Sequence, residues 1–145
     1  MGIYLRKIIA WVVNNTLEAK WLIEAVEKAK RTRHVTRPLI MHADRGCQCT
    51  STDDIDATEG MTRSYSKKAY PWDNACIESF HSLLKREWIN RFKIMDYKHA
   101  YQLVFENIET FYNTVRIHSH CNYEPPNGHE KKYWREWRKL EIEAA

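Results

Sequence analysis

The sequence is poor in the residues that mark several structural classes. Its 145 residues include only four glycines, four prolines and four cysteines, while 12% are aromatic. This balance excludes a collagen-like or disordered chain, because enough large apolar groups are present to offset the entropy lost on folding. The cysteines, at positions 47, 49, 76 and 121, are too few and too irregularly spaced for the disulfide framework of a small secreted domain. We therefore expect reduced thiols.

Long hydrophobic runs and a strong charge of either sign are also missing. No stretch of about 18 apolar residues occurs, and Arg6 and Lys7 interrupt the apolar start of the chain, so we expect neither a membrane span nor a secretory signal. The formal net charge is only +4. These features predict one domain over residues 1–145 of a cytoplasmic protein, with no membrane partner and no small-molecule substrate.

A structural zinc site is not favoured. The chain does contain side chains that bind zinc, namely His42, Cys47, Cys49, His118, His120 and Cys121. Structural zinc sites, however, use closely spaced cysteine pairs, and the chain has no two cysteines separated by two residues. We therefore look for metal ligands among the carboxylates.

Hydrophobic periodicity predicts an α/β fold whose helices gather toward the C-terminus. Short apolar runs predict strands over residues 8–13, 39–41 and 61–66. Apolar stripes predict helices over residues 17–31, 75–91, 97–115 and 131–145, while residues 50–59 form at most a two-turn helix. Thr16 is the expected N-cap of the first helix, and Asp73 or Asn74 that of the second. Pro125 to Gly128 break the chain before the last helix.

Two carboxylates stand where an α/β fold places functional groups. Asp44 follows the second predicted strand, and the loops at the carboxyl ends of strands favour functional side chains. Glu78 faces away from the apolar stripe of its helix, on the same side as Ser82 and Lys85. If that helix crosses the strand ends, Asp44 and Glu78 converge and share a divalent cation, which suits phosphoryl chemistry. The alternative is a turn aspartate and a solvated glutamate.

Four short motifs occur in order along the chain. Residues 42–48 read His-Ala-Asp-Arg-Gly-Cys-Gln, and residues 72–80 read Trp-Asp-Asn-Ala-Cys-Ile-Glu-Ser-Phe. Residues 111–119 read Phe-Tyr-Asn-Thr-Val-Arg-Ile-His-Ser, and Tyr123 and Pro126 follow. In this order the motifs resemble the integrase-type catalytic domain of bacterial insertion-sequence transposases.

The resemblance implies an RNase H-like fold and a triad of two aspartates and one glutamate. Such a triad holds two Mg²⁺ or Mn²⁺ ions for cleavage and strand transfer of DNA. Asp44 matches the second aspartate and Glu78 the glutamate, and the partner implied is DNA in the bacterial nucleoid. Lys85 reproduces the family's Glu-x6-Lys spacing with Glu78, which makes it a candidate DNA contact. Further candidate DNA contacts are Arg45, Lys67, Lys68 and Arg116.

One expected carboxylate has no counterpart. The family's first aspartate lies on a strand upstream of the segment matched here by residues 4–11, so we expect an integrase core that lacks its first strands, with an incomplete triad. The interval between Asp44 and Glu78 is also slightly shorter than is usual in the family. The loss of a central strand exposes the edges of the strands 8–13 and 39–41, which predicts a rearranged sheet or a homo-oligomer.

Three functions are compatible with these observations. The first is metal-dependent DNA strand transfer, which requires that the missing segment be supplied from elsewhere. The second is a non-catalytic DNA-binding remnant that uses the basic run from Lys28 to Arg37. The third is a self-association module built from the long helices and the aromatic tail. Only the first explains why the motifs occur together, so we expect transposase ancestry with activity limited by the absent aspartate.

Overall fold

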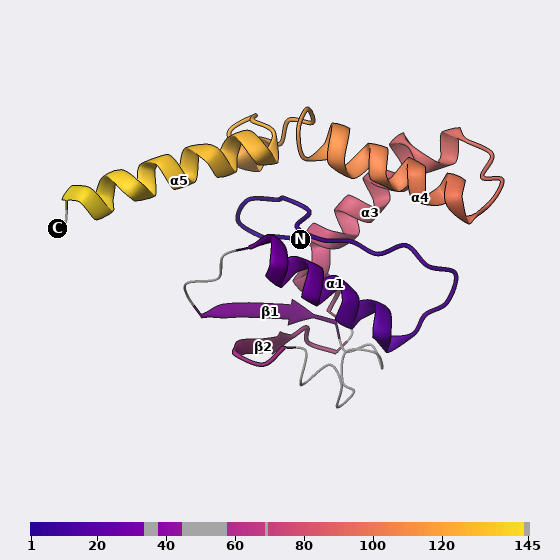
Figure 1. Cartoon of the computed structure of the whole chain (residues 1–145), viewed down its shortest axis with the longest axis horizontal. Coiled ribbons are helices and arrows are strands. Elements are labelled where there is room, and N and C mark those ends of the chain that lie inside the picture. The colour runs from indigo at the N-terminus through magenta and orange to yellow at the C-terminus, as the bar shows by residue number, and fades with distance from the viewer. Residues whose placement is uncertain (34–37, 45–57, 69, 144–145) are drawn as a thin grey trace. The chain divides into compact units, whose positions relative to one another are not determined.

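The computed structural model describes residues 1–33, 38–44, 58–68 and 70–143 (Figure 1). By their contacts the residues fall into two compact units. Unit 1 contains Met1–Ile8 and Leu84–Ala145, and unit 2 contains Ile9–Leu83. The boundary between them falls within helix α3 (Ala75–Glu87). The described elements are mixed helix and strand, as the sequence predicts.

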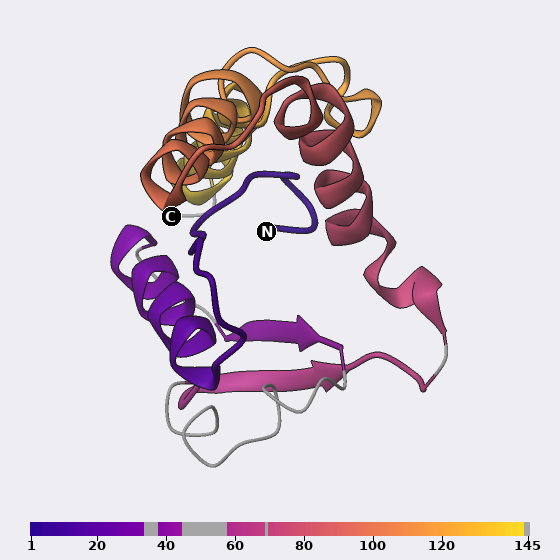
Figure 2. The same cartoon turned by 90° about the vertical axis from the view of Figure 1, so that its right-hand side faces the viewer.

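Unit 2 is built on a two-stranded parallel sheet. Strand β1 (Leu39–Ala43) pairs with β2 (Met61–Tyr65) in a register that places His42 opposite Ser64. Figure 2 shows the two strands side by side with their carboxyl ends pointing the same way. Both strand predictions are confirmed, and β1 extends two residues beyond the predicted range. Of the predicted short helix at residues 50–59, residues 50–57 lie outside the described residues.

Helix α1 (Ala19–Thr32) precedes the sheet and confirms the first helix prediction. Its N-cap residue is Glu18, so the expected cap at Thr16 is wrong. The Thr16 hydroxyl donates to the Glu18 carboxylate at 2.7 Å and accepts from the Trp21 indole at 3.0 Å. The hydroxyl therefore bonds to side chains near the start of α1. It does not cap a backbone N–H group of the first turn.

Residues 8–13 do not form the predicted strand. The backbone N–H of Ile8 donates to Asn113 Oδ1 at 3.0 Å, and Asn113 Nδ2 donates to the Ile8 carbonyl at 3.0 Å. Both residues belong to unit 1 and both are buried. An amide side chain thus takes the two hydrogen bonds that a neighbouring strand would otherwise supply. Ile8 is thus buried without sheet pairing, and residues 9–13 are half-buried.

A 3-10 turn, η2 (Pro71–Asn74), leads from the sheet into α3. The predicted N-caps of this helix bond back to the segment after β2: the Asp73 carboxylate accepts from the Lys67 backbone N–H, and Asn74 Nδ2 donates to Ser66 Oγ. Helix α3 ends at Glu87, four residues before the predicted end. The backbone of Trp88 leaves the helical region, and a second 3-10 turn, η3 (Ile89–Arg91), follows.

The first long element of unit 1 changes its winding along its length. Helix α4 (Tyr97–Phe105) is capped by Asp96, whose carboxylate accepts from the His99 backbone N–H at 2.7 Å. It continues as a π-helical segment, η4 (Glu106–Tyr112). The extra residue in each π turn rotates the apolar face along η4. Of the residues in the predicted stripe, Ile108 and Tyr112 are buried, whereas Tyr97, Tyr101, Phe105 and Val115 are exposed.

A tight corner leads from this segment to the last helix. The 3-10 turn η5 (Ser119–Cys121) is followed by Asn122 and Tyr123, both in the left-handed region with φ of 54° and 59°. Helix α5 (Pro126–Glu143) begins five residues earlier than predicted, because the fixed φ of proline suits the first helical position.

The first turns of α5 are attached to the N-terminal segment of the same unit. Lys7 forms an ion pair with Glu130 at 2.6 Å, and the ring of Tyr4 lies 5.6 Å from that of Tyr133. The last turns of α5 are exposed, with Leu140 and Ile142 at 60% and 78%. No helix in the described part of the chain is long and apolar enough to cross a lipid bilayer.

Candidate metal and nucleic-acid site

The carboxyl ends of the two strands are joined by a hydrogen-bond network centred on Ser66. This serine is 6% exposed, and its backbone N–H donates to the Ala43 carbonyl at 3.0 Å. Its hydroxyl lies 3.2 Å from His42 Nε2 and accepts from Asn74 Nδ2 at 2.7 Å. His42 Nδ1 lies 3.0 Å from the hydroxyl of Ser64 on the neighbouring strand. The network therefore ties the end of β1, the end of β2 and the turn before α3 together.

Asp44 and Glu78 lie close in sequence to residues of this network. Asp44 follows Ala43 directly, and Glu78 lies four residues after Asn74, about one helical turn. Both residues are exposed. Figures 1 and 2 show that the carboxyl ends of the strands point toward the side of unit 2 where α3 begins. The strand end before Asp44 and the turn before α3 are therefore joined by hydrogen bonds, and both carboxylates are open to solvent.

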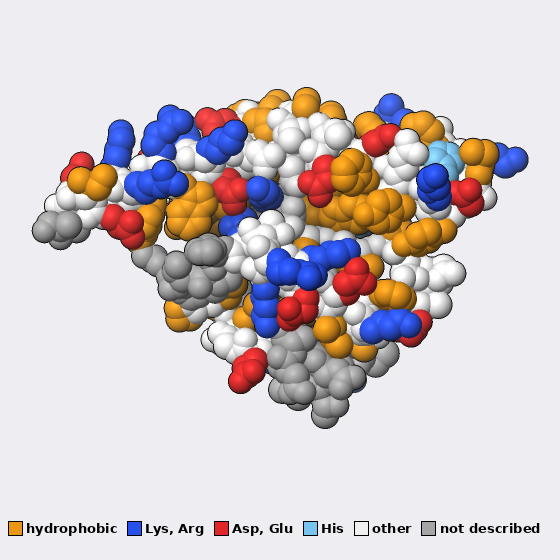
Figure 3. All heavy atoms as spheres, in the orientation of Figure 1, with side chains coloured by type: hydrophobic (Ala, Val, Ile, Leu, Met, Phe, Trp, Pro, Cys, Tyr) orange, Lys and Arg blue, Asp and Glu red, His pale blue; other side chains and the backbone are white. Residues whose placement is uncertain are grey.

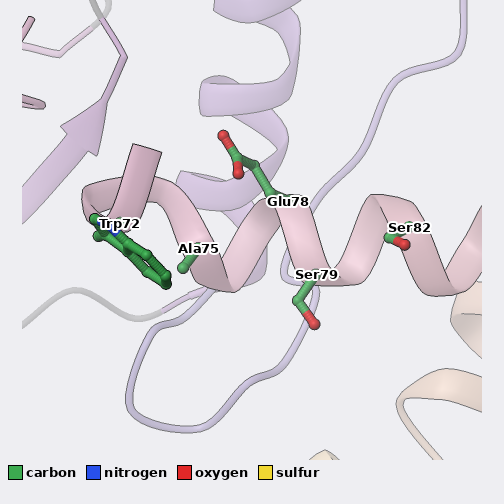
Figure 4. Close-up of a pocket in the computed structure, with 5 residues that line it drawn as sticks. All are labelled: Trp72, Ala75, Glu78, Ser79 and Ser82. Atoms are coloured by element: carbon green, nitrogen blue, oxygen red, sulfur yellow. The ribbon is translucent and has the colours of Figure 1, made fainter. Parts of the chain in front are cut away.

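The exposed face of α3 contains a shallow open hollow beside Glu78. It has a volume of about 450 Å³ and is lined by Trp72, Ala75, Glu78, Ser79 and Ser82. Figure 4 shows the ring of Trp72 at the N-terminal end of the helix, with Glu78 and Ser79 pointing to opposite sides of α3. The indole is 75% exposed, so a large flat apolar surface lies open next to a carboxylate.

The donor set suits one hard divalent cation. Mg²⁺ binds through one or two carboxylates and completes its shell with water and substrate phosphates, and Asp44 and Glu78 supply two such carboxylates. Among the described residues no group of three or more His, Cys, Asp or Glu side chains is placed to hold a metal ion.

The predicted DNA contacts differ in their exposure and in their ion pairing. Lys67 and Lys68 of unit 2 are exposed just after β2, and Lys85 is exposed on α3, seven residues after Glu78. Arg45 lies outside the described residues. In unit 1, Arg116 forms a hydrogen-bonded ion pair with Glu87, so a DNA contact by Arg116 would have to break this pair.

The remaining motif residues form internal contacts in unit 1. Glu87 falls within the apolar stripe of α3 and needs a donor, which it finds in Arg116. The ring of His118 lies edge-on to Tyr112 at 4.8 Å. Burial and the nearby positive charge of Arg116 hold the pKa of His118 below its ordinary value. The C-terminal signature, including the Asn113 contact with Ile8, therefore stabilises this unit.

Sequence reasoning missed Ser66, whereas Trp72 entered it as the first residue of the motif at residues 72–80 and as an aromatic near basic residues. A serine after a short strand carries no distinguishing pattern, and its partners His42 and Asn74 lie 24 and 8 residues away. The exposure of Trp72 has a weak sequence signal, since the residue precedes the helix and falls outside its apolar stripe.

Comparison with known proteins places the chain among mobile-element proteins. The integrase core domain family matches residues 59–126. The chain is 37% identical over 133 residues to the transposase for insertion sequence element IS904 of Lactococcus lactis subsp. lactis (strain IL1403), covering 90% of this chain and 53% of that protein. It is 33% identical over 134 residues to transposase InsF for insertion sequence IS3A of Escherichia coli (strain K12), covering 91% of this chain and 46% of that protein.

A third relative is the insertion element IS600 uncharacterized 31 kDa protein of Shigella sonnei, which is 30% identical over 133 residues, or 90% of this chain and 49% of that protein. The chain therefore spans about half the length of each of these relatives. The matched segment contains Glu78, Asn113 and Arg116, and the alignments with the relatives cover nine-tenths of the chain. Together these matches show that the chain is similar to insertion-sequence transposases and that its residues 59–126 match an integrase core domain.

Proposed function

We propose that this chain is the part of a transposase that supplies two of the carboxylates for metal-dependent cleavage and strand transfer of DNA. The observation that carries the proposal is the network through Ser66, which ties the strand that ends before Asp44 to the helix that carries Glu78. The fold proposed is an RNase H-like core without its first strands. A third carboxylate, from a segment outside the described residues, would complete the site.

In this proposal Asp44 and Glu78 hold a Mg²⁺ or Mn²⁺ ion through their oxygens. When bound, such a cation supplies Lewis-acid polarisation of a scissile phosphate. The role of the protein residues is positional: His42, Ser66 and Asn74 fix the backbone segments from which the two carboxylates project. Because the carboxylates are exposed, a phosphate group has access to them.

The surroundings of Glu78 suit a DNA strand. Lys67 and Lys68 follow β2, and their exposed ammonium groups would attract phosphates without regard to base sequence. The exposed indole of Trp72 would stack on an unpaired base. Lys85, on the same helix as Glu78, would contact the backbone further along the strand. The protein would thus act on nucleoid DNA in the cytoplasm.

The first experiment measures Mn²⁺ binding to the chain, using the electron paramagnetic resonance signal of free Mn²⁺. We expect Asp44→Asn and Glu78→Gln each to weaken binding by at least about tenfold, because each removes one anionic ligand. Glu59→Gln is the matched control, since Glu59 is an exposed carboxylate of unit 2 outside the site. Equal Mn²⁺ affinity in all four proteins would contradict the proposal.

The second experiment tests catalysis by supplying the missing segment. The chain alone is expected not to nick duplex DNA in Mn²⁺. A chimera would fuse it to the part of the Lactococcus lactis relative that precedes the matched region. We expect Mn²⁺-dependent nicking by the chimera and its loss in the chimera with Glu78→Gln. Nicking by the chain alone that depends on Glu78 would show that two carboxylates suffice.

Self-association is a further part of the proposal. In the described sheet β1 has one strand neighbour, and Leu39 and Ile40 are 40% and 71% exposed. An apolar strand edge of this kind pairs readily with another chain, so a homo-oligomer would cover it. Sedimentation velocity over a concentration series tests this, and a monomer at every concentration would contradict it.

A further inference from the structure

Helix α5 has one strongly basic face. Five bases lie within nine residues, and on a helical wheel they fall within about 120° of one another. No acidic residue falls within that sector. All five side chains are exposed, and Figure 3 shows Lys and Arg side chains gathered over this helix. We call this set the α5 basic face; it comprises Lys131, Lys132, Arg135, Arg138 and Lys139.

The arrangement works against the stability of the isolated helix. Side chains three and four residues apart are neighbours on a helix surface, and like charges at these spacings repel. The four such neighbours of Arg135 are Lys131, Lys132, Arg138 and Lys139, and every one of them is basic. A helix selected for stability alone would place acids at some of these positions. The repulsion is relieved when an external polyanion covers the face.

The basic residues of α1 provide a contrast within the same chain. Lys28 pairs with Glu24 at 2.8 Å and Lys30 with Glu27 at 3.4 Å, so their charges are compensated along their own helix. In the α5 basic face, Lys132 pairs with Glu124 at 3.1 Å, and Glu124 lies outside the helix. Across the part of the chain that the structure describes, the other four bases of the α5 basic face form no ion pair.

We infer that the α5 basic face binds the phosphate backbone of duplex DNA as a sequence-independent anchor, apart from the carboxylate site. Residues 131 and 139 are separated by about 12 Å along the helix axis. Duplex DNA presents about seven phosphate charges over that length, so several side chains can contact phosphates at once. The choice of DNA as partner rests on the proposed function. The face itself is independent of Asp44 and Glu78.

A membrane surface fits this helix less well. Helices that lie on membranes insert an apolar face opposite their basic face. On the first half of α5 the apolar side is already occupied, since the ring of Tyr133 contacts those of Tyr4 and Trp134, and Glu130 on that side pairs with Lys7. DNA requires no free apolar side, because its phosphates are bound by the exposed charges alone.

The test is fluorescence anisotropy of a labelled duplex of arbitrary sequence, titrated with the whole chain over a salt series in EDTA. The variant combines Lys131→Gln, Arg135→Gln and Arg138→Gln, since glutamine favours helix and carries no charge. We expect affinity to fall at least about tenfold, and the slope of log K against log salt to fall by about 3, one for each lost phosphate contact. Circular dichroism checks that α5 remains helical.

The matched control removes three exposed bases of the same unit outside α5, as Arg91→Gln, Lys93→Gln and Lys98→Gln. We expect the control to keep most of the affinity, and an equal loss in both variants would overturn the proposal. It would also be overturned by an unchanged salt slope in the α5 variant, by no duplex binding in the parent chain, or by equally tight binding to phosphatidylserine vesicles. Because EDTA removes metal, Glu78→Gln should bind DNA normally, which separates this inference from the proposed metal site.

Discussion

The motif carboxylates of unit 2 are exposed, whereas two motif residues of unit 1 are bonded to other parts of the chain. In unit 2, Asp44 and Glu78 are exposed, and Ser66 links the strand end before Asp44 to the turn before the helix of Glu78. In unit 1, Asn113 is buried and bonded to the backbone of Ile8, and Arg116 is paired with Glu87. Position within a motif therefore does not reveal a residue's role. Exposure and hydrogen bonding separate the residues available for chemistry from those that stabilise the fold.

The sharpest test of this comparison is Asn113→Ala. Asn113 is 2% exposed, and its loss leaves the Ile8 N–H and carbonyl without these partners. We expect the free energy of unfolding to fall by about 3 kcal/mol, the cost of two unsatisfied buried groups. Urea denaturation measures it, with the exposed Asn90→Ala as control. If Asn113→Ala has the same free energy of unfolding as the parent, then Asn113 does not stabilise unit 1 and the contrast with the exposed carboxylates of unit 2 fails.

Ser66→Ala tests whether the network in unit 2 positions the carboxylates. It removes the hydroxyl bonded to Asn74 and close to His42, and we expect a loss of about 2 kcal/mol in stability. We also expect Mn²⁺ binding to weaken by about tenfold, as for other groups that orient metal ligands. Thr62→Ala, an exposed change on β2, is the control. If stability falls but Mn²⁺ affinity does not, Ser66 is structural only.

A double-mutant cycle on Arg116 and Glu87 gives a smaller effect. The side chains are 22% and 31% exposed, so their ion pair is partly screened by solvent. We expect a coupling energy of about 1 kcal/mol from the single variants Arg116→Gln and Glu87→Gln and the double variant. DNA affinity is measured on the same proteins. If Arg116→Gln weakens DNA binding more than it weakens the fold, then Arg116 contacts DNA after all.

The smallest expected effect is the pH dependence due to His118. Its pKa lies below the ordinary value of 6.5, first because of burial and then because of Arg116. The unfolded chain therefore binds this proton more tightly, so the contribution of neutral His118 to stability is present above about pH 6.5 and is lost as the pH falls through the lowered pKa. Urea midpoints measured from neutral to acidic pH should fall less steeply in His118→Gln than in the parent or in the His81→Gln control.

Short-range patterns predicted the elements around the site. The apolar runs of β1 and β2 and the stripe of α3 are local features, and the outward direction of Glu78 follows from helical geometry alone. The exposure of Asp44 agrees with its place directly after a strand. These local patterns were sufficient to nominate both carboxylates.

Some wrong or incomplete predictions concern residues whose partners lie far away in the sequence. The sequence shows that Ile8 to Val13 is apolar, but the partner of Ile8 is Asn113, 105 residues away. A strand and a buried extended segment have the same local composition. The winding of η4 and the start of α5 at Pro126 likewise depend on surroundings that local periodicity does not contain.

The corner at Asn122 and Tyr123 determines the direction in which α5 leaves the unit. Left-handed backbone is costly for residues other than glycine, so it persists only where neighbours hold it. Here the backbone N–H groups of Asn122 and Tyr123 donate to the carbonyls of Ser119 and His118 at 3.2 and 2.9 Å. Inserting a residue at this corner would break these bonds and change the direction of the whole helix. The sequence of α5 would stay the same, but its basic face would point in a new direction.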